Sequence, residues 1–123
     1  MTTNIVKCLF SIIFFTLIIK GSCVCTIDNI QIGTQRSGRE IKGIPEWNVS
    51  VINNCACPQS QIKLLCKGFQ TEEPVDPNIL SKEGDNCLLI NGNTLKAFDS
   101  VQFSYAWDPP FLLWPQYSIV GSC

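Results

Sequence analysis

The chain has 123 residues, with nine basic and ten acidic side chains, a formal net charge of −1 and no histidine. This length accommodates a single small domain, and the lack of a basic excess argues against nucleic acid or an anionic membrane as a partner. Without histidine, the chain lacks the commonest general base and metal ligand, so we expect no enzyme, no metal and no cofactor.

The N-terminal residues predict a secretory signal peptide. A basic residue, Lys7, precedes an apolar run of 12 residues from Cys8 to Ile19, and small residues follow it. The run is shorter than the ~20 apolar residues of a membrane-spanning helix, and no second such run follows, so we expect no membrane span. Cleavage after Cys23 would give a signal peptide at 1–23 and one cysteine-rich β domain at 24–123, secreted to the extracellular space (the apoplast).

The cysteines support this cleavage site. It would leave six of the eight cysteines, whereas a cut after Gly21 would leave seven and an unpaired thiol. An even number in an oxidising compartment predicts three disulfides. Zinc sites need wider spacing than Cys55-x-Cys57, and a bond between these two would be strained, so each is expected to bond elsewhere. The predicted disulfide cysteines are Cys25, Cys55, Cys57, Cys66, Cys87 and Cys123.

Alternation of apolar and polar residues then predicts short strands in chain order. The clearest is 47–52, where Trp47, Val49 and Val51 would face the core and Asn48 would face solvent. The other predicted strands are 27–33, 62–66, 87–90, 94–96, 101–105 and 117–120. About seven short strands with almost no helical periodicity predict an all-β fold, a small disulfide-stapled antiparallel β-sandwich.

Polar and turn-forming residues mark the expected connections. Residues 34–40, which include Arg36 and Arg39, are predicted to form an exposed loop. Residues 67–85 are predicted to form a long polar connection, with a helical turn at 78–82. Asn91-Gly92 predicts a hairpin turn between the strands at 87–90 and 94–96.

Two further motifs indicate surface functions. Asn48-Val49-Ser50 is the only N-glycosylation acceptor after residue 23, so Asn48 is the candidate glycosylation site. Trp107 and Trp114 flank a proline-stiffened segment, where they would either contact a partner or cap one end of the sandwich. The acidic residues of 67–85 lie in a polar loop, and nothing in the sequence holds two of them at the fixed separation that catalysis needs.

Several short segments carry a family resemblance. They are Ile30-Gln-Ile-Gly-Thr-Gln35, Trp47-Asn-Val-Ser-Val-Ile-Asn-Asn-Cys55, Cys66-Lys-Gly-Phe69, Cys87-Leu88, Asn91-Gly92, Phe103-Ser-Tyr-Ala-Trp107 and the terminal Cys123. In these segments and in cysteine order, the chain resembles the plant family of small secreted cysteine-rich proteins named after TAPETUM DETERMINANT. The resemblance implies an extracellular ligand of a leucine-rich-repeat receptor kinase that fixes cell fate in the anther.

Two functions remain open at this point. The first is a signalling ligand for a receptor-kinase ectodomain, with Arg36, Arg39, Trp107 and Trp114 as candidate contact residues. The second is a non-catalytic cell-wall carbohydrate-binding module, in which Trp107 and Trp114 would stack on a polysaccharide. We favour the ligand, because such modules do not usually occur without an enzyme and do not need three disulfides.

Overall fold

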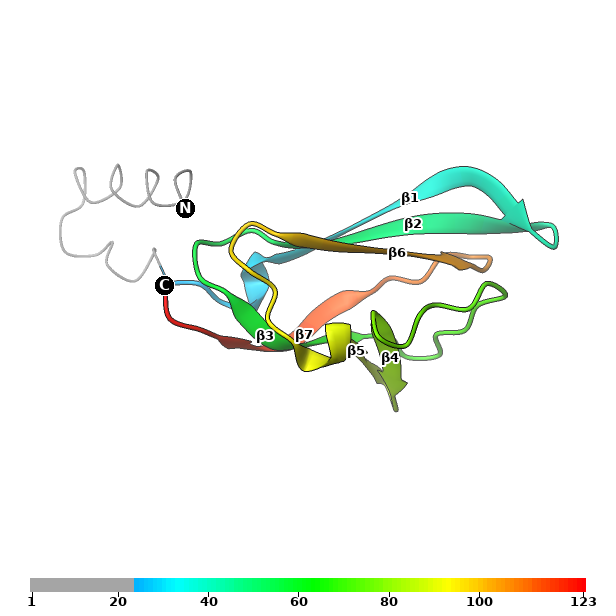
Figure 1. Cartoon of the computed structure of the whole chain (residues 1–123). Coiled ribbons are helices and arrows are strands. Elements are labelled where there is room, and N and C mark those ends of the chain that lie inside the picture. The colour runs from blue at the N-terminus through cyan, green and yellow to red at the C-terminus, as the bar shows by residue number, and fades with distance from the viewer. Residues whose placement is uncertain (1–23) are drawn as a thin grey trace.

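The computed structural model describes residues 24–123, so the predicted signal peptide lies outside the described residues. Two antiparallel sheets form two layers (Figure 1). The three-stranded sheet has the order β1-β2-β6, with β1 at Ile30–Ile41, β2 at Ile44–Asn53 and β6 at Ser100–Ala106. The four-stranded sheet has the order β4-β5-β3-β7, with β4 at Leu80–Glu83, β5 at Asn86–Leu89, β3 at Gln59–Leu65 and β7 at Trp114–Val120. The predicted disulfide-stapled β-sandwich is thus confirmed.

The core lies between the two layers. Val49 and Val51 of β2 are fully buried, as the alternation of this strand predicts. Tyr105 of β6 and Leu64 of β3 are also fully buried in the same cluster. Trp47 is only partly buried and packs against the edge of this core. The alternation therefore identified the core-facing side of β2.

Three disulfides join Cys25 to Cys55, Cys57 to Cys123 and Cys66 to Cys87. The first two start from the segment after β2 and hold both ends of the described chain, which lie at one end of the molecule (Figure 1). The third joins the end of β3 to β5. The sulfurs of Cys25, Cys55 and Cys57 lie within 4.8 Å of one another, but each belongs to a disulfide and so is not a thiolate ligand.

The prediction of a loop at residues 34–40 is wrong, because these residues belong to β1. Arg36 pairs with Trp47, and after a bulge Glu40 pairs with Pro45. This part of the β1–β2 hairpin extends away from the termini and past the neighbouring strands (Figure 1). Both of its faces carry polar residues there, so the apolar alternation that would reveal a strand is missing.

The predicted hairpin at Asn91-Gly92 is also wrong. Ile90–Gly92 form a short 3₁₀ helix, η3, and residues 94–96 do not return alongside β5. Instead, Leu95 exchanges two backbone hydrogen bonds with Gln59 of β3, at 3.0 and 2.7 Å. Leu95 is only 3% exposed, so its burial outweighs the local turn preference.

The helical turn predicted at 78–82 is replaced by an edge strand. Leu80 begins β4 and pairs with Leu89 of β5. Its side chain is buried in the core, and strand pairing places it there. A second short 3₁₀ helix, η2 at Ile27–Asn29, occupies the start of the strand predicted at 27–33.

Candidate functional site

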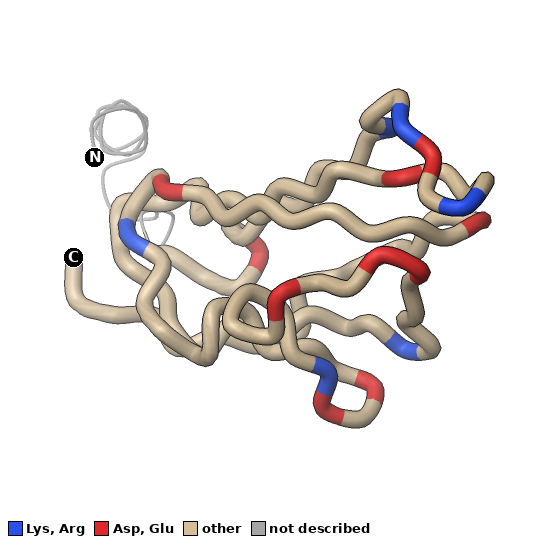
Figure 2. The backbone as a smooth tube through the Cα atoms, turned by 45° about the vertical axis from the view of Figure 1, so that its right-hand side comes forward, with Lys and Arg blue, Asp and Glu red and all other residues tan. Residues whose placement is uncertain are grey.

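Charged residues gather at the end of the molecule that lies away from the C-terminus (Figure 2). We call this region the hairpin end and define it as Arg36, Ser37, Arg39 and Glu46 of the β1–β2 hairpin with Glu73 of the neighbouring connection. Arg36 and Arg39 are both exposed. The hairpin end is therefore the first candidate for a surface that recognises a partner.

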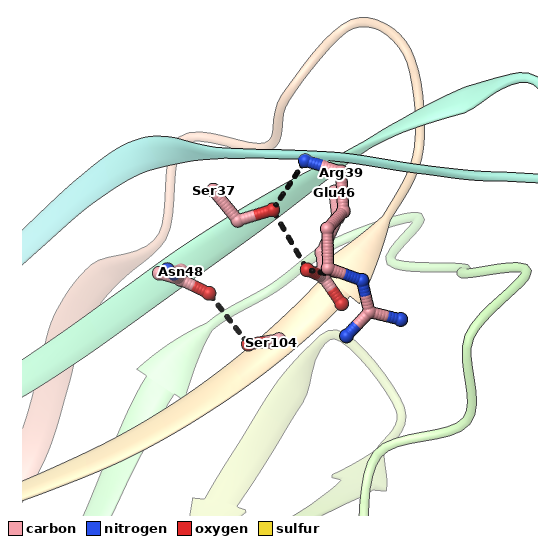
Figure 3. A network of polar contacts seen from close by, with 5 residues as sticks. All are labelled: Ser37, Arg39, Glu46, Asn48 and Ser104. Carbon is pink, nitrogen blue, oxygen red and sulfur yellow. Dashed lines mark hydrogen bonds and ion pairs between the residues drawn. The ribbon is translucent and has the colours of Figure 1, made fainter.

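A bulge in β1 brings Ser37 and Arg39 over Glu46 (Figure 3). The Ser37 hydroxyl accepts a hydrogen bond from the backbone N–H of Arg39 at 3.0 Å and donates one to Oε1 of Glu46 at 2.7 Å. Nε of Arg39 lies 3.7 Å from the same oxygen. The Glu46 side chain is 4% exposed and that of Arg39 is 68% exposed, so a buried carboxylate positions an outward-facing guanidinium.

Glu46 has a second acidic neighbour, Glu73. The hydrogen bond from Ser37 and the contact with Glu73 hold the pKa of Glu46 below its ordinary value. Burial, with the neighbouring Glu46 charge, raises the pKa of Glu73. Oε1 of Glu73 is buried and has no hydrogen-bond partner among the described residues. The raised pKa of Glu73 and the lowered pKa of Glu46 both favour a single negative charge opposite Arg39.

The segment that carries Glu73 is fixed to the free side of β6. The backbone N–H of Glu72 donates to the Ala106 carbonyl at 2.9 Å, and the Ala106 N–H donates to the Thr71 hydroxyl at 2.8 Å. The same hydroxyl donates to the Glu73 carbonyl at 2.8 Å. Ala106 in turn pairs with Glu46 across the sheet, and these contacts bring the two glutamates together. Lys42 Nζ lies 4.0 Å from a carboxylate oxygen of Glu72 beside them.

Arg36 contributes a second arrangement at the hairpin end. Its guanidinium carbon lies 5.6 Å from the centroid of the Trp47 ring, a cation–π geometry. Nε1 of Trp47 donates to the Trp107 carbonyl at 2.9 Å, and the Trp107 N–H donates to the Pro45 carbonyl at 3.2 Å. The Trp107 side chain is half-buried and packs against the core, so it closes this end of the sandwich.

Of the four predicted contact residues, Arg36 and Arg39 belong to the hairpin end, Trp107 is hydrogen-bonded beside it, and Trp114 lies elsewhere. It begins β7 and is 59% exposed, next to Leu112, which is 84% exposed. Both line a hollow of about 360 Å³ beside Ile30 and Ile32 of β1. Trp107 is hydrogen-bonded instead to Trp47 and Pro45, so the two tryptophans belong to different surroundings.

The outer side of β7 adds a strip of exposed apolar residues. Tyr117 is 48% and Ile119 is 47% exposed, and both line an open groove of about 760 Å³. Lys63 Nζ lies 5.9 Å from the centroid of the Tyr117 ring and 3.9 Å from a carboxylate oxygen of Glu83. The groove is thus lined by a lysine whose charge is compensated by Glu83.

Asn48 lies on the outer side of β2. It is exposed, and its Oδ1 accepts a hydrogen bond from the Ser104 hydroxyl of β6 at 2.7 Å (Figure 3). This is the solvent-facing position that the alternation of the strand predicts. Among residues 24–123, the structure contains no helix that is long and apolar enough to cross a membrane.

Comparisons with known proteins connect this architecture to a family. The family model described as "Tapetum determinant 1, C-terminal" matches residues 26–121, which include both sheets and the hairpin end. The chain belongs to the tapetum determinant 1 family. The resemblance found in the sequence is thereby confirmed.

Curated relatives share between 27% and 34% of their aligned residues with the chain. It is 33% identical over 95 residues to the rice (Oryza sativa subsp. japonica) "TPD1 protein homolog 1A", covering 70% of this chain and 42% of that protein. It is 27% identical over 85 residues to the Arabidopsis thaliana "TPD1 protein homolog 1", and the alignment covers 67% of this chain and 48% of that protein. An uncharacterized A. thaliana protein is 34% identical over 86 residues, and the alignment covers 67% of this chain and 65% of that protein. The chain thus matches about half the length of its named relatives. No solved structure matches it.

The sequence did not reveal the glutamate pair of this family member. Glu46 precedes Trp47, where the predicted strand at 47–52 begins, and its alternation with Asn48 gives no sign that it is buried. Glu73 lies in a connection with no periodic pattern. The only local signal for Glu46 is its position between Pro45 and a strongly apolar strand, which is too general to predict a partner 27 residues away in the sequence.

Proposed function

We propose that this member of the tapetum determinant 1 family is a secreted signalling ligand that binds the ectodomain of a leucine-rich-repeat receptor kinase. Residues 1–23 would direct it into the secretory pathway and be removed after Cys23, and the remaining domain would act in the apoplast. It would act in cell-fate decisions during reproductive development, as in the anther. The observation that carries this proposal is the family match across residues 26–121.

The stapled fold suits this role. The disulfides Cys25–Cys55 and Cys57–Cys123 fix the ends of the domain, so a partner would meet a surface that is already ordered. Binding then loses little conformational entropy, which favours affinity from a small contact area. The domain itself performs no chemistry in this proposal.

We place the receptor contact at the hairpin end. Arg39 is held by Ser37 and Glu46, and Arg36 lies over Trp47, yet both guanidinium groups remain exposed. Exposed arginines in fixed positions suit recognition of carboxylates on a partner, because the guanidinium offers paired donors. Charges at the rim of an interface act mainly on partner selection and association rate.

The alternative function, a carbohydrate-binding module, has less support. It requires Trp107 and Trp114 on one stacking platform. Trp107 packs against the core and Trp114 lies beside β1, in a different setting. Trp114 alone, with 59% of its surface exposed, would remain for a sugar ring.

Charge reversal at the two arginines tests the proposal. Residues 24–123, secreted and oxidised, are titrated against a panel of purified leucine-rich-repeat receptor-kinase ectodomains. Arg36→Glu and Arg39→Glu should each weaken binding by about tenfold or more. Lys96→Glu is the matched control, since Lys96 is exposed and lies outside the hairpin end. Equal binding by all three variants would contradict the proposed contact surface.

A further inference from the structure

The outer face of the three-stranded sheet has a shallow polar hollow beside Asn48. It measures about 290 Å³ and is lined by Gly33, Thr34, Gln35, Asn48 and Ser50. Gly33 pairs with Ser50 and Gln35 pairs with Asn48 across β1 and β2, so these residues lie side by side. Small-molecule sites start at ~300 Å³, so the hollow suits a ligand about as large as one sugar ring.

The missing side chain of Gly33 creates the space. No atom lies within 4 Å of the position that a Cβ at Gly33 would occupy. The backbone of Gly33 is ordinary strand, and its φ is not in the left-handed region that favours glycine. Neither crowding nor backbone strain therefore requires glycine here.

Asn48 lines this hollow, and its amide is held in place by β6. The Ser104 hydroxyl donates to Oδ1 at 2.7 Å and so fixes the orientation of the amide. No described residue accepts a hydrogen bond from Nδ2. The buried Val49 places Asn48 and Ser50 on the same outer side of β2, which keeps the acceptor motif of an N-glycan on the surface of the folded domain.

We propose that Asn48 carries an N-linked glycan whose first N-acetylglucosamine residue occupies the hollow above Gly33. The proposal rests on the proposed entry into the secretory pathway, where the donor is a lipid-pyrophosphate-linked oligosaccharide. Nδ2 of Asn48 forms a bond to the anomeric carbon, the bond from that carbon to the pyrophosphate oxygen breaks, the amide loses one proton and the lipid pyrophosphate leaves. The side chains of Gln35 and Ser50, which share the outer face with Asn48, offer hydrogen-bond partners to the bound sugar.

Such a glycan would shield one face of the molecule. Asn48 lies on the central strand of the three-stranded sheet, so the sugar chain would cover the outer side of β1, β2 and β6. Glu46 lies two residues before Asn48 on the same outer side of β2, so the sugar chain would also reach the Ser37–Glu46 side of the hairpin end. Protein partners would then be confined to the Arg36 side of the hairpin end, the strip on β7 and the outer side of the four-stranded sheet. This narrows the surfaces on which a receptor contact is to be sought.

Occupancy is tested at Ser50, which leaves Asn48 itself intact. The full chain is produced in plant cells, alongside a version in which a known signal peptide replaces residues 1–23. Peptide mass spectrometry before and after a core-fucose-tolerant peptide-N-glycosidase should show one released glycan and conversion of Asn48 to aspartate. Ser50→Ala should lose the glycan completely, and Ser50→Thr should retain it.

The two versions separate the possible failures. If the full chain stays inside the cell while the version with the known signal peptide is glycosylated, secretion by residues 1–23 fails and the glycan proposal stands. If the second version reaches the medium without sugar on Asn48, the glycan proposal is overturned and the ligand proposal is untouched.

Gly33→Leu tests the place of the first sugar. A leucine side chain would fill the hollow and displace the ring, so glycosidase release from the folded protein should be faster than in the wild type. After denaturation both proteins should release their glycan at the same rate. Equal rates from the folded proteins would overturn the proposed seating of the sugar.

Discussion

Nε of Arg39 lies 3.7 Å from Oε1 of Glu46, whose side chain is almost completely buried. Glu46 also contacts the carboxyl of Glu73, so three ionisable groups share one small volume at the hairpin end. The pKa of Glu73 is raised and that of Glu46 is lowered, so the two carboxyl groups respond to pH in opposite directions.

The free energy of unfolding is expected to fall as pH rises through the raised pKa of Glu73. The folded state binds this proton more tightly than the unfolded state, so the contribution of Glu73 is fully present below its unfolded pKa. Glu46 acts oppositely, because its pKa is lowered and its contribution is lost as pH falls through that value. The free energy of unfolding should therefore be greatest at a pH between the lowered pKa of Glu46 and the raised pKa of Glu73 in the folded protein. Denaturant unfolding at a series of pH values measures this profile.

Glu73→Gln separates these effects. Glutamine retains a donor for Glu46 but does not titrate. The fall in the free energy of unfolding at pH values above the maximum should therefore disappear. Glu72→Gln is the matched control, because Glu72 is a neighbouring surface glutamate, and it should leave the profile nearly unchanged. If the free energy of unfolding of Glu73→Gln still fell in the same way as pH rises, Glu73 would not be the titrating group.

Asn53 is expected to be the most sensitive polar residue of the core. It is fully buried, and its Nδ2 faces the carbonyl oxygens of Cys57 and Leu95 at 2.9 and 3.1 Å. Its Oδ1 accepts from Nε2 of Gln59 at 3.4 Å. Asn53→Ala leaves buried groups unpaired and should lower the free energy of unfolding by about 1–3 kcal/mol or more. The exposed control Asn93→Ala should change it little, and a similar effect in both would contradict this account.

Tyr105 is expected to stabilise the loop before β7. Its hydroxyl accepts a hydrogen bond from the Phe111 N–H at 2.8 Å, and its ring packs against Phe69 with centroids 5.2 Å apart. Burial raises the pKa of Tyr105, so the phenol stays neutral. Tyr105→Phe retains the packing but loses the acceptor, at a cost of about 1–3 kcal/mol. Tyr117→Phe, on the exposed strip, should cost much less in the same unfolding assay.

The disulfides should differ in their effects on stability. Cys57–Cys123 spans 66 residues and Cys66–Cys87 spans 21. If the bonds act mainly on the unfolded chain, replacing the first pair by alanine costs about 4 kcal/mol and replacing the second about 3 kcal/mol. Thermal unfolding of the two double variants measures this order. A larger loss from the shorter loop would indicate that packing around Cys66 and Cys87 dominates instead.

The sequence predicted those parts of the fold where burial imposes a pattern. Val49 and Val51 alternate with less buried residues, and the prediction at 47–52 lies within β2. Arg36 and Arg39 lie on a strand that extends past the neighbouring strands, where nothing selects apolar residues, so this part of β1 was mistaken for a loop. Leu95 pairs with Gln59, 36 positions earlier, and no local signal reports such a contact.

The candidate site was predictable only in its exposed parts. Arg36 and Arg39 were found because charge in a polar segment suggests a surface. The glutamate pair was not, because Glu46 and Glu73 meet only after β6 has been placed between their segments. Trp107 and Trp114 are close in sequence, yet Trp107 packs on the core while Trp114 begins a new strand.

The measurement that tests the central claim most directly is a pull-down with the secreted, oxidised domain. It is incubated with solubilised plant membranes and, in parallel, with insoluble cell-wall polysaccharides, and bound proteins are identified by mass spectrometry. The ligand account predicts retention of a leucine-rich-repeat receptor kinase that is lost with Arg36→Glu and Arg39→Glu and kept with Lys96→Glu. Retention on polysaccharide alone, abolished by Trp114→Ala and with no receptor bound, would contradict it.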